Sequence, residues 1–113
     1  TTGASTRQLV DDAKALMEAM LETGLNVAGL SAHLGVSRNH LLAAFQQEAG
    51  ASPIAYLRAA RLRRAKELLA GTTHSLAAIA AACGYGHVKY FLRCFRDAEG
   101  ITPGAWRKHK IGP

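Results

Sequence analysis

The side chains that could do chemistry in this sequence are two cysteines, five histidines and a surplus of lysine and arginine. Cys83 and Cys94 stand inside apolar helical patterns with neither metal-ligand nor redox-motif spacing, which favours buried free thiols in a reducing compartment. The histidines are scattered and no two have ligand spacing, so we expect no metal and no cofactor. The basic residues are therefore the leading candidates for function.

The basic residues are unevenly distributed along the 113 residues of the chain. The formal net charge is +6, and 11 of the 14 lysines and arginines follow residue 57, against 3 of the 8 acidic residues. A basic balance of this kind favours a polyanionic partner. A protein that is merely basic is the alternative. No apolar run reaches transmembrane length and no signal peptide is visible, so we expect no membrane partner.

One segment of the sequence occurs twice, 50 residues apart. The stretches "AGASPIAY" (49–56) and "EGITPGAW" (99–106) both give glycine, Ser or Thr, proline and a large aromatic residue at the same spacing. Upstream, "NVAGLSAHLGV" (26–36) aligns with "SLAAIAAACGY" (75–85) at an offset of 49. One extra residue has therefore entered the second copy just after its glycine, where a turn tolerates it.

Each copy predicts a helix, a turn and a second helix. Asn26 and Ser75 are good N-caps, and the apolar residues after them recur at helical spacing. Gly35 and Gly84 suit a left-handed turn at the end of each first helix, and Ser37 can cap the next one. A further glycine ends each second helix. No strand pattern is visible, so we expect an all-α fold.

The repeated Ser/Thr-Pro pairs open the helices that follow each copy. Pro53 and Pro103 stand at the first helical position, where the missing N–H costs nothing. Tyr56 and Trp106 come one turn later, where their rings can brace the preceding helix as part of the core. Seven helices result, and we expect one region 1–113 made of a subdomain 5–52, a long linking helix 53–71 and a subdomain 72–113.

A helix pair joined by a tight glycine turn is the helix-turn-helix motif, whose second helix can enter the major groove of DNA. Polar residues lie off the apolar face of each second helix, as with Arg38 and Asn39 or Lys89 and Arg93. A plain helical bundle is the alternative. The repetition, the polar faces and the net charge favour DNA binding.

Two long stretches, "SRNHLLAAFQQEAGASPIAYLRAARLRRAKELL" and "IAAACGYGHVKYFLRCFRDAEGITPGAWR", resemble the two halves of the DNA-binding domain of the AraC/XylS family of bacterial transcription regulators. The second stretch carries the family's more specific pattern, and the resemblance covers about residues 9–108. It implies two helix-turn-helix subdomains joined by a long central helix. It also implies two recognition helices that enter successive major grooves, one DNA turn of about 34 Å apart.

The resemblance implies a set of DNA-contacting residues on both recognition helices. Arg and Lys can bind guanine, Asn39 can pair with adenine, and apolar side chains can touch a thymine methyl. The chain departs from the family at Ala43, where arginine is common. The alternative for the two glutamines is that they only form a polar helix surface. For Lys89 the alternative is a phosphate contact or a solvated side chain. For Arg93 it is an ion pair within the protein. The residues at matching positions are Arg38, Asn39, Leu42, Ala43, His87, Val88, Lys89 and Arg93, and we further expect DNA contacts from Gln46, Gln47, Arg96 and Arg107.

We therefore expect sequence-specific binding of double-stranded DNA that regulates transcription in the bacterial cytoplasm, with no enzymatic activity. Similar domains occur in DNA-repair methyltransferases, but their chemistry needs a cysteine-rich zinc site that two cysteines cannot build. A bundle that contacts only protein, such as RNA polymerase, is another alternative. The domain is expected to be monomeric. Because the chain opens at Thr1, we expect a fragment of a longer regulator that dimerises through an N-terminal domain.

Overall fold

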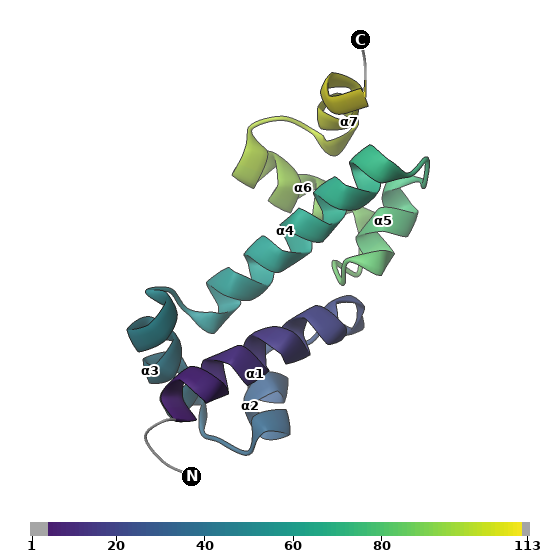
Figure 1. Cartoon of the computed structure of the whole chain (residues 1–113). Coiled ribbons are helices and arrows are strands. Elements are labelled where there is room, and N and C mark those ends of the chain that lie inside the picture. The colour runs from purple at the N-terminus through teal and green to yellow at the C-terminus, as the bar shows by residue number, and fades with distance from the viewer. Residues whose placement is uncertain (1–4, 112–113) are drawn as a thin grey trace. The chain divides into compact units, whose positions relative to one another are not determined.

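The computed structural model describes residues 5–111, so the ends of the predicted region 1–113 lie outside the described residues. Within this range the fold is all-α, with seven α-helices and one short 3-10 helix, η1 (Figure 1). This confirms the expected fold class and number of helices. The bounds are α1 Ser5–Ala19, η1 Leu21–Thr23, α2 Val27–Leu34, α3 Arg38–Ala49, α4 Pro53–Gly71, α5 Leu76–Ala82, α6 Val88–Glu99 and α7 Pro103–Ile111.

The predicted N-caps are confirmed by hydrogen bonds in the first turn of each helix. The side-chain oxygens of Asn26, Ser37 and Ser75 accept from backbone N–H groups three residues later, at 2.8, 3.0 and 3.1 Å. Each bond satisfies one donor that a helix leaves open at its start. Helix α1 ends at Ala19, and the chain continues as the short η1.

Counted from its first left-handed glycine to the N-cap of the next helix, the second turn is one residue longer than the first, as the repeat predicts. Gly35 has a φ of 69° and Gly84 has a φ of 84°, so both adopt the left-handed conformation that favours glycine. The second turn contains another left-handed residue, Gly86, with a φ of 82°. His87 follows it as the N-cap of α6, in the place that Ser37 takes before α3, but without a side-chain cap bond. Gly86 therefore accommodates the extra residue.

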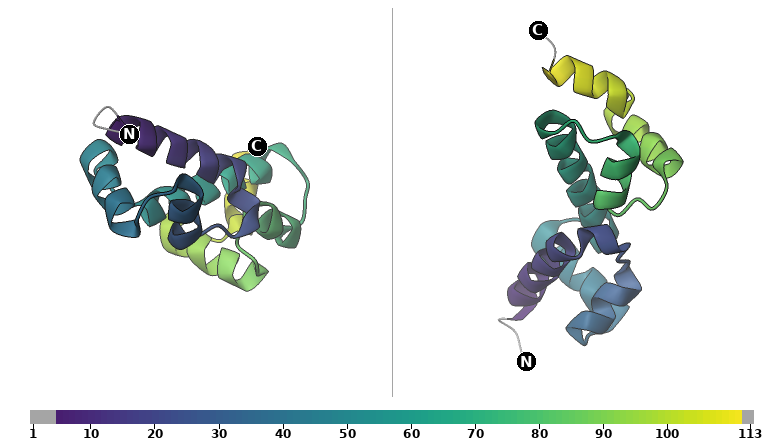
Figure 2. Two further views of the ribbon diagram at one scale, coloured as in Figure 1. Left: turned by 90° about the horizontal axis from the view of Figure 1, so that it is seen from below. Right: turned by 90° about the vertical axis from the view of Figure 1, so that its right-hand side faces the viewer.

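The chain divides into two compact units, and the division falls inside α4, after Ala60. In the first unit, α1 packs against α2 and α3 (Figure 2). Its core centres on Met17, Leu30, Leu41 and Phe45. The start of α4 completes this core with buried side chains.

The second unit has a separate core, built where α6 packs against α5 and α7. Ile79, Cys83, Phe91 and Phe95 are fully buried there. The second part of α4 contributes Ala65 and Leu69. The predicted subdomain limits 5–52 and 72–113 stay predictions, because α4 supplies side chains to both cores.

The residues that follow the repeated Gly-x-Ser/Thr-Pro motif pack against α3 and α6 in the same way. Ser52 and Thr102 cap α4 and α7 through their hydroxyl oxygens, each at 3.1 Å from an N–H group. One turn later, Tyr56 contacts Phe45 with ring centroids 6.2 Å apart and an interplanar angle of 61°. Trp106 contacts Phe95 at 6.0 Å and 77°. Edge-to-face pairs of this kind add to the burial of both rings.

Candidate nucleic-acid interface

Helix α6 has one buried and one exposed face. Phe91 and Phe95, four residues apart, are fully buried, and this spacing places them on one side of the helix. Lys89, Arg93 and Arg96 are exposed at spacings of four and three residues, so they share another face. The core thus fixes α6 while three cations face solvent.

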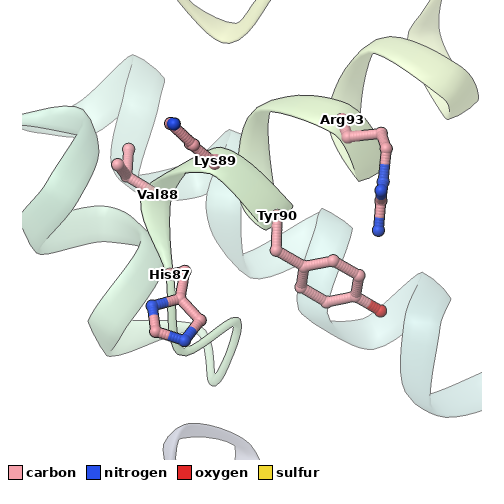
Figure 3. Close-up of a pocket in the computed structure, with 5 residues that line it drawn as sticks. All are labelled: His87, Val88, Lys89, Tyr90 and Arg93. Carbon is pink, nitrogen blue, oxygen red and sulfur yellow. The ribbon is translucent and has the colours of Figure 1, made fainter.

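The start of α6 surrounds an open hollow of about 540 Å³ (Figure 3). It is lined by His87, Val88, Lys89, Tyr90 and Arg93. Four of these are predicted site residues, and the structure brings them together. Tyr90 is the addition, and it is 40% exposed despite its large aromatic ring. Its spacing of three residues from Arg93, on a predicted helix, is the sequence signal that could have found it.

The Arg93 guanidinium lies over the Tyr90 ring, with 5.5 Å between Cζ and the ring centroid. Within residues 5–111, no carboxylate lies within ion-pair distance of Arg93 or of Lys89. The internal ion pair considered for Arg93 is therefore absent from the described part of the chain. Both cations keep N–H donors available for an external acceptor.

Helix α3 presents the corresponding face of the first unit. Its core side chains are Leu41, Ala44 and Phe45. Leu42 is 39% exposed, and Ala43 is exposed but carries no hydrogen-bonding group. The other predicted residues of this helix are also exposed, and in the described part of the chain their side chains have no hydrogen-bond or ion-pair partner. These are Arg38, Asn39, Gln46 and Gln47.

Arg107 is placed differently from the other predicted residues. Its Nε donates to the carbonyl oxygen of Leu69 at 3.0 Å, its Nη1 to that of His74 at 2.9 Å, and its Nη2 to that of Thr72 at 3.1 Å. Three of its five N–H donors are thus used inside the second unit. A DNA contact through the remaining two stays a prediction.

Both cysteines in the described residues are free, and burial keeps the thiol of Cys83 neutral. Desolvation raises the pKa of Cys83 from about 9 to about 11, partly opposed by the positive charge of Arg64. Desolvation also raises the pKa of Tyr85, well above its usual range. Both groups stay uncharged at neutral pH, so this core adds no charge beneath the exposed face of α6.

Between residues 5 and 111, no group of three or more His, Cys, Asp or Glu side chains is placed to hold a metal ion. None of the helices in this range has the length and apolar character needed to cross a membrane.

Comparison with known proteins gives concordant matches. A family model described as a helix-turn-helix domain matches residues 30–109. The HTH-type transcriptional regulator GbdR of Pseudomonas aeruginosa is 38% identical over 89 residues, which cover 79% of this chain and 24% of that protein. The chain spans about a quarter of the length of the curated relatives it matches.

Two solved structures share the fold over most of both chains. A transcriptional regulator of the AraC-type DNA-binding class from Chromobacterium violaceum superposes with a TM-score of 0.84 at 33% identity, covering 98% of this chain and 99% of that chain. The DNA-binding domain of the global transcriptional factor AdpA, solved with a target DNA, gives 0.82 at 25% identity, covering 88% and 89%. The chain therefore belongs to the helix-turn-helix family of AraC-type DNA-binding domains.

Proposed function

We propose that this chain binds double-stranded DNA sequence-specifically through α3 and α6, entering successive major grooves, and thereby regulates bacterial transcription. The observation that carries the proposal is the exposed face of α6. Lys89, Arg93 and Arg96 share this face, while Phe91 and Phe95 fix the helix in the core. A rigid helix with available cations on one side suits the major groove, which is wide enough for an α-helix.

The side chains on the two helices supply different base contacts. Arg93 can bind guanine O6 and N7 with two parallel hydrogen bonds, and Lys89 can donate to either acceptor. Asn39 can pair with adenine N6 and N7, while Val88 and Leu42 can contact a thymine methyl. Recognition of the base pairs therefore combines hydrogen bonds from α6 with hydrogen bonds from the Asn39 amide and apolar contacts from α3.

Phosphate contacts supply the affinity that does not depend on sequence. Arg38 and Arg96 are charged candidates, and Gln46 and Gln47 can donate through their amides. These contacts orient the helices in the grooves while the base contacts select the site.

The relatives support this function. GbdR is named as a transcriptional regulator and the Escherichia coli relative as the xylose operon regulatory protein, and AdpA was solved with a target DNA. A role in transcription places the chain in the bacterial cytoplasm, as a DNA-binding module rather than an enzyme. One chain carries two recognition helices, so the domain binds as a monomer. Contact with RNA polymerase and dimerisation through a further domain stay predictions that rest on the resemblance.

The test starts with a duplex selected from a random pool by the chain itself. We expect affinity for that duplex to exceed affinity for an unrelated duplex by about 10³-fold or more. The logarithm of the binding constant should fall linearly with the logarithm of salt concentration, at about −0.9 per phosphate neutralised. Fluorescence anisotropy measures both quantities.

A matched pair of charge removals identifies the face used. Arg93→Ala should reduce affinity for the selected duplex about 10-fold or more, since it removes a bidentate base contact. Arg7→Ala removes the same charge from an exposed position of α1, outside both helix-turn-helix motifs, and should change it less than about 2-fold. Equal losses in the two variants, or no selected sequence at all, would refute the proposal.

A further inference from the structure

We propose that Tyr90 is a specificity-determining residue that acts on DNA through Arg93. The ring holds the guanidinium at the mouth of the hollow, so that its N–H groups are presented to one guanine in the major groove. This inference rests on the proposed function of α6.

Tyr90 has a large aromatic ring that is not buried in the core of the second unit. It is 40% exposed, while its neighbour Phe91 is fully buried. Exposure of such a ring costs free energy unless something covers it. In the structure, the side chain that lies over the ring is Arg93, one turn along the same helix.

The ring is itself fixed from the other side. Tyr90 meets Tyr85 edge-to-face, with centroids 6.1 Å apart at 61°. Tyr85 is buried and contacts Phe91 at 4.9 Å. Aromatic contacts therefore connect the core of the second unit with the exposed ring that lies beneath Arg93.

Attraction to a ring suits a base-reading arginine better than an ion pair does. A carboxylate occupies the N–H fork, whereas a ring attracts the cation and leaves the N–H groups available for other acceptors. Figure 3 shows the Arg93 side chain beside the Tyr90 ring, with Lys89 pointing away from both. Holding a long side chain in place before binding reduces the ordering that binding requires.

The first unit provides an internal contrast. At the offset of 50 residues, Tyr90 and Arg93 correspond to His40 and Ala43. At these two positions α6 thus has an arginine and a phenol ring, whereas α3 has an alanine and an imidazole. This agrees with the two residues acting as a pair.

The test measures how strongly the chain discriminates between bases at each position of the site. If Tyr90 only stabilised the fold, its removal would not reduce discrimination at one base pair alone. Affinities are measured for the duplex selected by the unmodified chain and for all its single-base substitutions. The variants are Arg93→Ala, Tyr90→Leu, Tyr90→Phe and the double variant Tyr90→Leu/Arg93→Ala. Arg93→Ala identifies the base pair that Arg93 reads.

At that base pair we expect Tyr90→Leu to reduce discrimination about 2- to 5-fold, which corresponds to loss of an exposed cation–π contact. Discrimination elsewhere, and affinity for an unrelated duplex, should stay within about 2-fold. Tyr90→Phe keeps the ring and should keep the discrimination. In the Arg93→Ala background, Tyr90→Leu should have no further effect.

Several results would overturn the inference. They are unchanged discrimination in Tyr90→Leu, an equal loss at all base pairs, or additive losses in the double variant. If Arg93→Ala reduces discrimination at one base pair and Tyr90→Leu does not, this inference fails and the proposed function stands. If the chain selects no sequence, the proposed function fails with it. Should Tyr90→Leu melt below the assay temperature, Tyr90→Gln removes the ring with a good helix former and decides the same question.

Discussion

Two arginines of the second unit use their guanidinium groups in opposite ways. Arg93 lies over a ring and keeps its N–H donors available for an external acceptor. Arg107 donates to three backbone carbonyls, that of Leu69 in the last turn of α4 and those of Thr72 and His74 in the loop before α5. The Leu69 carbonyl is among the last four of α4, which a helix leaves without backbone partners. Arg107 therefore fixes the segment that leads into the second helix-turn-helix motif.

Removal of Arg107 should destabilise the second unit. Arg107→Ala deletes three charge-assisted hydrogen bonds, two of them partly buried, and we expect a loss of about 2–3 kcal/mol in the free energy of unfolding. Arg107→Lys should not restore the loss, because a single ammonium lacks the planar fork that reaches separate acceptors. Urea unfolding followed by circular dichroism measures both variants.

The matched control for this prediction is the neighbouring position. Lys108→Ala removes an exposed cation from the same helix and should leave the free energy of unfolding within about 0.5 kcal/mol. If Arg107→Ala instead unfolds like the unmodified chain but binds DNA with a salt slope lower by about 1, phosphate binding is the role of Arg107.

In the second turn, Gly86 is needed for its backbone conformation and not for lack of space around it. Gly86 has a φ of 82°, and a Cβ built there meets no heavy atom within 4 Å. Any cost of a side chain at this position is therefore conformational. Gly104, near the start of α7, also has open space around a built Cβ, but its backbone is helical.

The two glycines should respond to alanine in opposite directions. Gly86→Ala should lower the free energy of unfolding by about 1–2 kcal/mol, because a left-handed φ is costly for an L-residue. Gly104→Ala should raise it by about 0.5–1 kcal/mol, since alanine restricts the unfolded chain and fits the helix. Thermal melts of the two variants check this. A stabilised Gly86→Ala chain would show that the turn tolerates another conformation.

The ring contacts of Tyr56 with Phe45 and of Trp106 with Phe95 support the expectation that Tyr56 and Trp106 belong to the cores. Trp106→Ala should lower the free energy of unfolding by about 2–4 kcal/mol, less than for a fully buried ring because Trp106 is half-buried. Trp106→Phe keeps an edge-to-face partner for Phe95 and should recover much of the loss. The measurement is a urea titration.

A different result for Trp106→Ala would assign the ring to DNA binding. If Trp106→Ala unfolded like the unmodified chain but lost DNA affinity, the ring would be a nucleic-acid contact. Tyr56→Ala tests the same point in the first unit, where the ring pairs with Phe45 and lies beneath the Lys14 ammonium at 5.1 Å.

For the whole molecule, the sequence was sufficient to predict the helices and their order, because caps, glycines and prolines are local signals. Ser37, Gly84 and Pro103 each act within a few residues of their own position. The role of Arg107 could not be predicted in this way, and for Tyr90 the spacing from Arg93 is visible in the sequence but the placement of the ring is not. The carbonyl partners of Arg107 are 33 to 38 residues away in the chain. The position of Tyr90 depends on how Tyr85 packs beneath it.

The two units of the molecule repeat one architecture but not one reading surface. Helix α6 exposes Lys89 and Arg93. Helix α3 exposes Leu42 and Ala43 at the corresponding face, where Asn39 supplies the amide that can bind a base. A bidentate pair discriminates by about 1–3 kcal/mol, and an apolar contact with a thymine methyl should contribute less. We therefore expect sequence information to be concentrated in the DNA segment that α6 contacts.

Affinities for every single-base substitution across the selected duplex test this asymmetry. Arg93→Ala should relax one segment only, while Arg38→Ala should weaken binding evenly across sequences, as a phosphate contact does. Ala43→Arg places a guanidinium at an exposed position of α3, so it should sharpen discrimination in the segment that α3 contacts. If that segment is already the more sensitive one in the unmodified chain, Arg38 and Asn39 must carry the specificity, and Ala43 is not a lost contact.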